Sequence, residues 1–435
     1  MKAFLNCLPR ILAASISKSL SPKAITFVTA PEALQTRIKI DEKFERKRII
    51  LRRGCSIIKT LDEISKNGSD FKSLLEIHEN VQNLTKYLQP DSRPCYPPLK
   101  KSNAGIMTYV LDTKSDKSDL FCLPLKCGTT SYQRALASEL TKRFSSLPEQ
   151  KRSKIEKMLR PRKGPLESDD MNAPKVYYMM SLFGGKRFMN PAHFERIEST
   201  NRSTPVYENI DEMARVINTR NPFDRIHAAW SDKFRVSKLN FVKWWHYVEF
   251  IKNFEDKRFP IPKNYTVSFE AFVKYLSIGD SDTYNRHWRS IFWSCHPCQL
   301  KYDFILDIAT AEQDSKYIFD LLSFKTHLPM RHDSSSDHSN SLSHYYRNIP
   351  KSVLKAVYSK YFLDFVLFDF NTDQVEKIIE SGNDEKYDVN SRLLQSKLSE
   401  FRKLLAEKRR EKGSDVEEYE NCNQPDYKRW WRLWD

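Results

Sequence analysis

Glycine is scarce in this chain, with 10 among 435 residues, which argues against a repetitive or fibrous architecture. Long hydrophobic runs are also missing. The apolar stretches near the N-terminus, at residues 11–14 and 25–30, are far shorter than the ~20 residues that cross a bilayer. Residues 1–31 contain basic residues and serines but no acidic residue. This composition fits a poor signal anchor, a transit peptide or a disordered tail, and it leaves all three open.

Acidic residues are fewer than basic ones: the chain has 56 Asp and Glu and 72 Lys and Arg, which gives a net charge of +16. A basic surplus favours anionic partners such as nucleotides, nucleic acid, acidic polysaccharides or membrane surfaces. The chain has neither a zinc-finger spacing nor an RNA-binding aromatic signature, so we expect no nucleic-acid partner. With 40% hydrophobic and 29% charged residues, the composition is that of a soluble globular protein with a sizeable core.

Eight cysteines and four Asn-x-Ser/Thr triplets bear on the compartment in which the protein folds. An even number of cysteines permits disulfides without proving an oxidising compartment. The triplets begin at Asn67, Asn83, Asn201 and Asn264. They favour the secretory pathway only mildly, because such triplets are frequent by chance.

The pattern of apolar residues divides the chain into segments of different character. Residues 32–100 are charged and helical in period, and they end in a proline-rich stretch. Short apolar runs then alternate with helical ones up to residue 370, which is typical of a layered α/β domain. We therefore predict a targeting or disordered segment over 1–40, a helical stem and Pro-rich linker over 41–107, an α/β domain over 108–372, and a charged helical extension over 373–435.

One segment has the pattern of a phosphate-binding loop. Residues 120–123 form a short apolar run that predicts a strand, and apolar residues at helical spacing follow from Tyr132. Gly128 permits close approach of the backbone, and the first N–H groups of the helix point at an anion. The hydroxyls of residues 129–131 and the mobile charge of Lys126 add donors. The loop is not a Walker A motif, because the lysine precedes the glycine. An ordinary strand–turn–helix with a capping threonine fits the pattern equally well.

A second segment places an arginine at the end of a predicted strand. Residues 213–219 suit a buried strand, Asn221 is a good N-cap and Pro222 is a good first helical residue. Arg220 therefore lies between the strand and the helix, where open α/β sheets bind ligands. Its guanidinium can hold a phosphate in a bidentate way. The alternative is a structural ion pair with a nearby aspartate, Asp224 or Asp232.

Together these two segments resemble the 5′-phosphosulfate loop and the 3′-phosphate motif of sulfotransferases. The first is similar to P-K-x-x-x-T-x-W/Y and K-x-G-T-T, and the second to R-x-P-F-x-R-x-x-S-A-Y. Three further blocks resemble H-W-R-P, C-x-P-C and Y-D-F-I of the carbohydrate sulfotransferases in the chondroitin, dermatan and HNK-1 group. These blocks are His287-Trp288-Arg289, Cys295-His296-Pro297-Cys298 and Tyr302-Asp303-Phe304-Ile305. The resemblance covers residues 118–370.

This resemblance implies an α/β fold with a parallel sheet flanked by helices, similar to P-loop kinases, with helical N- and C-terminal extensions. It implies 3′-phosphoadenosine 5′-phosphosulfate (PAPS) as the co-substrate and no metal. Lys126 would stabilise charge on the leaving phosphate oxygen, and His193 would be the base that takes the acceptor's proton. The residues implied for PAPS binding are Lys126, Cys127, Gly128, Thr129, Thr130, Ser131, Arg220 and Arg225.

The resemblance also implies a glycan acceptor of the glycosaminoglycan type and a type II membrane protein of the Golgi lumen, although no membrane anchor is evident. Two departures bear on activity: Leu125 stands between Pro124 and the loop lysine, and Ala228 replaces a serine whose hydroxyl contacts the 3′-phosphate. A silent homologue that only binds glycan is therefore the alternative function, and a P-loop kinase is a weaker one. For Cys295 and Cys298, a mutual disulfide, disulfides with distant cysteines and a zinc pair remain open, and the family's luminal setting favours disulfides.

Overall fold

The computed structural model of the protein describes residues 31–65, 86–88, 108–112, 118–132, 135–136, 139, 213–235, 246–254, 267–279, 284–328, 338–389 and 391–411. The chain divides into two compact units, Met1–Glu42 and Lys43–Asp435. In the first unit only the start of helix α2 (Pro31–Ser65) is described. The sheet and the described site residues all belong to the second unit. His193, the predicted base, lies outside the described residues.

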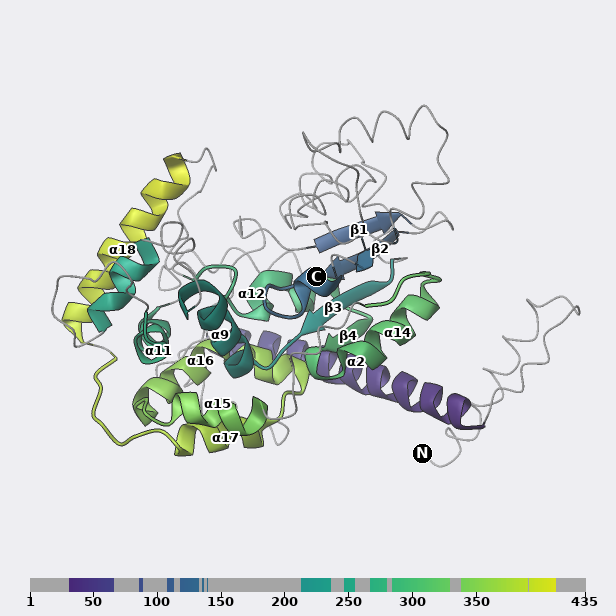
Figure 1. Ribbon diagram of the computed structural model, residues 1–435, viewed down its shortest axis with the longest axis horizontal. Helices are drawn as coiled ribbons and strands as arrows, with labels where there is room; N and C mark the ends of the chain where they lie inside the picture. The colour runs from purple at the N-terminus through teal and green to yellow at the C-terminus, as the bar shows by residue number, and fades with distance from the viewer. Residues whose placement is uncertain are drawn as a thin grey trace, which may run out of the picture. The chain divides into compact units, whose positions relative to one another are not determined.

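A four-stranded sheet with the order β1-β2-β3-β4 carries the candidate site (Figure 1). Its strands are β1 (Thr108–Asp112), β2 (Ser118–Cys122), β3 (Arg215–Thr219) and β4 (Phe304–Asp307). β2, β3 and β4 run parallel, and β1 adds an antiparallel edge strand. Residues 120–122 and 216–219 are fully buried, as expected for a parallel sheet covered on both faces. The predicted α/β fold with a parallel sheet is confirmed.

Helix α9 (Pro222–Trp230) follows β3 directly, and its start is the one that the sequence predicted. The side chain of Asn221 accepts the N–H of Phe223 at 3.0 Å, and Pro222 is the first helical residue. The other described helices and helical turns are η4 (Ser231–Arg235, a π-helical turn), η5 (Lys252–Phe254), α11 (Phe269–Ile278), α12 (Ile291–Cys295), α13 (Pro297–Leu300), η6 (Ile308–Thr310), α14 (Ala311–Leu321), α15 (His338–Tyr346), α16 (Lys351–Phe368), α17 (Thr372–Glu380) and α18 (Arg392–Glu411).

Helix α16 forms the centre of the helical core and is buried along most of its length. It packs against α11 and α12. Asp364 of α16 is fully buried and accepts the backbone N–H groups of Ile291 (2.9 Å) and Phe292 (2.8 Å), so it satisfies two donors at the start of α12. Burial raises the pKa of Asp364 to about 6, although these two N–H groups and Arg225 act in the opposite direction.

Helix α2, from Lys43 onward, packs into the same unit as the sheet. Phe44 is 2% exposed and meets the ring of Phe304 in β4 edge-on, with 5.5 Å between the centroids. The ammonium of Lys43 pairs with the buried carboxylate of Asp314 in α14 at 2.5 Å. A Cβ on Gly54 would lie 2.9 Å from the carbonyl oxygen of Val366, so glycine allows α2 to approach α16 closely. The helix that the sequence assigned to a stem therefore contributes to this core.

Two disulfides connect the predicted C-x-P-C block to distant parts of the chain. Cys298 is bonded to Cys55 in α2, and Cys295 is bonded to Cys122 at the end of β2. Of the pairings that the sequence left open, the structure has disulfides with distant cysteines. Because both sulfurs are bonded in this way, Cys295 and Cys298 do not supply thiolates to a zinc ion. Cys127 has a free, buried thiol.

Helix α18 has one packed face, as the spacing of its apolar residues indicates. Leu398, Phe401 and Leu405 are buried, whereas Leu393 is 65% exposed. Phe401 stacks on Phe250 with 4.2 Å between the ring centroids, and this contact joins α18 to the core. In the part of the chain that the structure describes, none of the helices combines the length and the apolar character needed to cross a membrane.

Candidate functional site

The loop after β2 is a tight turn that leads into helical residues beginning at Thr129. The Thr129 hydroxyl donates to the carbonyl of Pro124 at 2.6 Å, and the N–H of Cys127 donates to the same oxygen at 3.2 Å. Lys126 has a φ of 71°, in the left-handed region that costs a residue with a side chain ~1–2 kcal/mol. The loop thus keeps a strained lysine in place with hydrogen bonds inside the turn.

Gly128 is required by the geometry of this loop. Its φ is +73°, and a Cβ at this position would lie 2.7 Å from the Cδ1 of Ile308, just beyond β4. Without a side chain, the backbone comes close to the end of β4 while the first helical N–H groups follow directly after it. The first N–H groups of a helix have no partner inside the helix and carry a partial positive charge, so this arrangement suits an anion.

Lys126 forms an ion pair that the sequence did not predict. Its Nζ contacts the Asp232 carboxylate, 106 positions later in the chain, and Lys233 Nζ binds the same oxygen at 2.7 Å. Burial lowers the pKa of Lys126, and the neighbouring Lys233 and Arg220 act in the same direction, whereas Asp232 opposes them. Burial alone would raise the pKa of Asp232, but hydrogen bonds from the two lysines outweigh it and hold that pKa below its usual value.

Arg220 connects the segment after β3 to the loop after β2. It directly follows β3, and its Nη1 donates to the carbonyl of Lys126 at 3.1 Å. Its Nε is buried and has no hydrogen-bond partner among the described residues. Asn218 in β3 adds a hydrogen bond from its amide to the carbonyl of Cys127. The two motifs, far apart in sequence, therefore meet at the carboxyl ends of β2 and β3, where open α/β sheets bind ligands.

Arg225 lies in the same region, but its donors point at the protein backbone. The residue is 1% exposed. Its Nε donates to the carbonyl of Leu125 at 2.9 Å, its Nη2 to that of Arg286 at 3.3 Å, and its Nη1 to that of Arg289. The planar, five-donor fork of an arginine is suited to joining several carbonyls at once. Arg225 thus connects the loop after β2 to the turn that contains His287.

The remaining predicted loop residues differ in how they face solvent. Cys127 is fully buried, and burial raises the pKa of its thiol to about 11, so the thiol stays neutral at physiological pH. Thr129 is buried, Ser131 is partly exposed and Thr130 is exposed. The side chain of Cys127 therefore cannot face a ligand, whereas the side chain of Thr130 reaches solvent.

Sequence reasoning did not connect Asp232, Lys233 and His287 to Lys126. Asp232 and Lys233 lie in the π-helical turn η4 that extends α9, a kind of turn that is frequent at functional sites. His287 was singled out only as part of the H-W-R block, and its charge environment includes Lys126, Lys233 and Asp232. A signal was present, since Asp232 and Lys233 come one residue after the motif at 220–230 and His287 opens the H-W-R block. Pattern alone did not connect either segment to Lys126.

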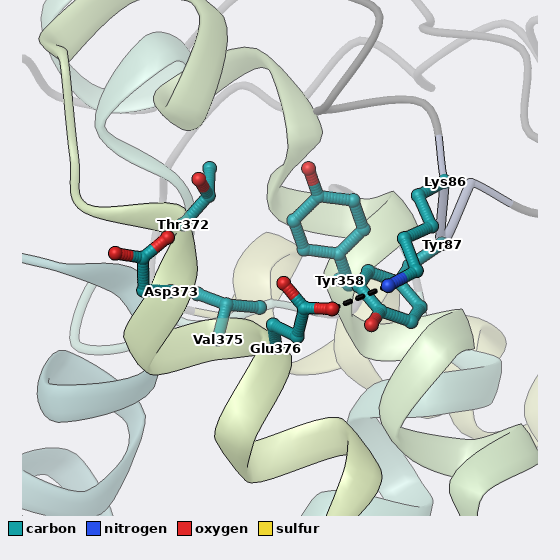
Figure 2. Close-up of a pocket in the computed structure, with 7 residues that line it drawn as sticks. All are labelled: Lys86, Tyr87, Tyr358, Thr372, Asp373, Val375 and Glu376. Atoms are coloured by element: carbon teal, nitrogen blue, oxygen red, sulfur yellow. Dashed lines mark hydrogen bonds and ion pairs between the residues drawn. The ribbon is translucent and has the colours of Figure 1, made fainter.

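A separate cavity of about 270 Å³ lies between α16, α17 and residues 86–87. Figure 2 shows Lys86 reaching the Glu376 carboxylate, next to the rings of Tyr87 and Tyr358. The Tyr87 hydroxyl donates to Glu380 at 3.0 Å. Lys86 and Tyr87 thus each bind a carboxylate of α17, and the ends of the parallel strands do not line this cavity. Among the residues that the structure describes, the anion-binding features meet at the loop after β2.

A profile of the sulfotransferase family matches residues 111–371, more than half of the chain, and the protein belongs to this family. This match confirms the family that the motifs indicated. Among curated proteins, the chain is similar to carbohydrate sulfotransferase 14 of Mus musculus, with 28% identity over 161 residues, 36% of this chain and 42% of that protein. It is also similar to carbohydrate sulfotransferase 11 of Mus musculus, with 27% identity over 218 residues, 46% of this chain and 62% of that protein.

A third relative is carbohydrate sulfotransferase 14 of Danio rerio, with 31% identity over 159 residues, 35% of this chain and 42% of that protein. The matches therefore span between 42% and 62% of the length of these relatives. No solved structure matches the chain.

Proposed function

We propose that the protein is a carbohydrate sulfotransferase that moves a sulfuryl group from PAPS to a hydroxyl of a glycan. One observation carries this proposal: the hydrogen bond from Arg220 to the carbonyl of Lys126 joins the two phosphate-type motifs at the carboxyl ends of parallel strands. Membership of the sulfotransferase family and the names of the relatives support the same reaction.

The described residues fit the anionic groups of PAPS. Gly128 provides a cradle that a Cβ would fill, and Arg220 has a buried Nε without a partner in the described part of the chain. Arg220 would hold the 3′-phosphate. The loop would bind the 5′-phosphate through the N–H groups of Gly128, Thr129 and Thr130 and through the hydroxyls of Thr130 and Ser131. When bound, PAPS supplies the activated sulfuryl group.

Lys126 acts on charge that develops during transfer. Its ammonium offsets the negative charge on the phosphate oxygen that leaves with the nucleotide, which is the kind of preorganised electrostatic stabilisation that lowers a transfer barrier most. Lys233 contributes positive charge beside it. The base that takes the acceptor's proton is predicted at His193 from the family resemblance.

The acceptor and the compartment are inferred from the charge of the chain and from its disulfides. The basic surplus of the chain suits an acidic glycan such as a glycosaminoglycan. The two disulfides between distant cysteines support folding in an oxidising compartment, which agrees with a Golgi lumen location. A type II membrane anchor remains a prediction from the family resemblance.

The experiment is transfer of labelled sulfate from PAPS to a panel of desulfated glycosaminoglycans, beside calorimetric binding of adenosine 3′,5′-bisphosphate. Lys126→Ala and Arg220→Ala are the test variants, and Lys316→Ala, on the exposed side of α14, is the matched control. We expect transfer by the wild type and the control, loss of transfer in both test variants, and weakened nucleotide binding in Arg220→Ala. Nucleotide binding without transfer to any glycan would favour the silent homologue, and a folded sample that binds no nucleotide would overturn the proposal.

A further inference from the structure

Asn218 is a polar side chain in an inner strand of the buried sheet. β3 lies between β2 and β4, and residues 216–219 are all fully buried. Asparagine is depleted in strands, and burying an amide costs free energy unless it forms hydrogen bonds. The Oδ1 of Asn218 is buried and has no hydrogen-bond partner among the described residues. Packing within the sheet therefore does not explain an asparagine at this position.

The amide nitrogen of Asn218 reaches the loop after β2. The last residue of β2 that pairs with β3 is Cys122, opposite Ile217, so Asn218 lies one residue beyond the end of that pairing. Its Nδ2 donates to the carbonyl of Cys127. A Cβ on Gly128 would lie 3.6 Å from the same nitrogen, so the amide lies directly against the turn.

The direction of this carbonyl fixes the direction of the next N–H group. A trans peptide is planar, and its C=O and N–H point in opposite directions. Because the carbonyl of Cys127 points toward the buried amide of Asn218, the N–H of Gly128 points away from β3. Gly128 is partly exposed, so a ligand can approach this N–H. The hydrogen bonds within the turn use other N–H groups, among them those of Cys127 and Ser131.

We propose that Asn218 is a positioning residue for the donor: by holding the carbonyl of Cys127, it directs the N–H of Gly128 to the 5′-phosphate of PAPS. The inference rests on the proposed sulfuryl transfer, in which the loop after β2 binds this phosphate. An N–H whose direction is fixed before the ligand arrives loses little entropy on binding and needs no reorganisation. Asn218 acts through the peptide between Cys127 and Gly128 and not by contact with the donor.

Thr219 provides a matched control in the same strand. It is also fully buried, and its hydroxyl donates to the carbonyl of Leu306 in β4 at 2.6 Å. Successive side chains of a strand point to opposite faces, so Thr219 faces away from the side on which Asn218 lies. Asn218→Leu and Thr219→Val each replace a buried polar side chain by an apolar one of the same branched shape and remove a hydrogen bond. Only Asn218→Leu removes a hydrogen bond to the loop.

Calorimetric titration of the full chain with two nucleotides tests the proposal. Adenosine 3′,5′-bisphosphate carries both phosphates and adenosine 3′-monophosphate lacks the 5′-phosphate, so the ratio of their Kd values isolates the 5′-phosphate contact. Asn218→Leu should reduce this ratio at least about tenfold, because one hydrogen bond to a charged group is worth that much. Thr219→Val should keep the wild-type ratio, and Arg220→Ala should weaken both nucleotides alike. If Asn218→Leu loses stability and keeps the ratio, its role is merely structural and the proposal is overturned.

The wild type supplies a second test that does not depend on a folded variant. In a nuclear magnetic resonance titration, the amide proton of Gly128 should move downfield when the bisphosphate binds, because it forms a charge-assisted hydrogen bond to the 5′-phosphate. It should not do so with the monophosphate. A Gly128 proton that stays in place while the bisphosphate binds overturns the proposal alone. A wild type that binds neither nucleotide overturns the proposed function, on which the proposal rests.

Discussion

Substitution of Arg225 tests whether its buried guanidinium positions the loop after β2 or binds the ligand directly. This guanidinium forms three hydrogen bonds to carbonyls, of which those to Leu125 and Arg289 are short and the one to Arg286 is 3.3 Å long. A hydrogen bond to a charged group is worth ~1.5–3 kcal/mol, and a buried carbonyl left without a donor adds to the loss. Two full bonds therefore give a loss of roughly 3–6 kcal/mol in the free energy of unfolding for Arg225→Ala.

Arg220→Ala is the matched comparison for this prediction. Arg220 is partly exposed and makes one hydrogen bond, to the carbonyl of Lys126, so its removal should cost about 1 kcal/mol of stability. The assays are urea unfolding of both variants and calorimetric titration with adenosine 3′,5′-bisphosphate. Arg220→Ala should lose affinity with little loss of stability, and Arg225→Ala should lose mainly stability. If Arg225→Ala unfolds within ~0.5 kcal/mol of the wild type and loses affinity as Arg220→Ala does, then Arg225 binds the nucleotide directly and the positioning role is refuted.

Three further changes have expected outcomes. Gly128→Ala should lower the free energy of unfolding by at least ~1–2 kcal/mol, because φ at this position is +73° and the methyl group would meet Ile308. It should also weaken nucleotide binding. Thermal unfolding with and without nucleotide measures both effects. Reducing the disulfides Cys122–Cys295 and Cys55–Cys298, which close loops of 173 and 243 positions, should lower stability by about 5 kcal/mol each in the chain-entropy account; urea unfolding with and without reductant measures this loss. Burial raises the pKa of Asp364 to about 6, so its folded form binds a proton that the unfolded chain has released. The stability of the wild type relative to Asp364→Asn should therefore fall by about 3 kcal/mol between pH 4 and pH 6.5 and stay level above it, and a flat difference would contradict the buried carboxyl.

The elements next to the site were predictable because their signals are local. A short apolar run predicted β2, and Asn221 with Pro222 predicted the start of α9, since a cap and a first-turn proline act within a few residues of the chain. The order of strand, loop and helix then placed Lys126 and Arg220 at the carboxyl ends of parallel strands. The hydrogen bond from Arg220 to the carbonyl of Lys126 shows that the two residues are in contact there.

Pairings across long sequence separations were not predictable from one sequence. Eight cysteines permit many connectivities, so nothing in the spacing joined Cys55 to Cys298. The charged, helical period of residues 32–100 predicted a helical stem, yet the same period suits both a solvated helix and a helix with one face against a core. In the structure, Phe44 contacts Phe304 and Gly54 lies close to α16, so one face of this helix packs against the core. One sequence does not show these contacts.

The Asp232 carboxylate offsets the positive charges that meet at the site. Lys126, Lys233 and Arg220 lie close together without a ligand, and like charges in a partly buried place repel one another. A carboxylate bound to both lysines offsets this repulsion, and its pKa is held below the usual value, so it stays ionised at physiological pH. The sequence pattern offered Asp232 as a partner for Arg220, but the π-helical turn η4 directs it to the loop lysine instead. If the proposed function holds, the same carboxylate that allows the cations to assemble is the group with which the phosphosulfate of PAPS would compete for Lys126.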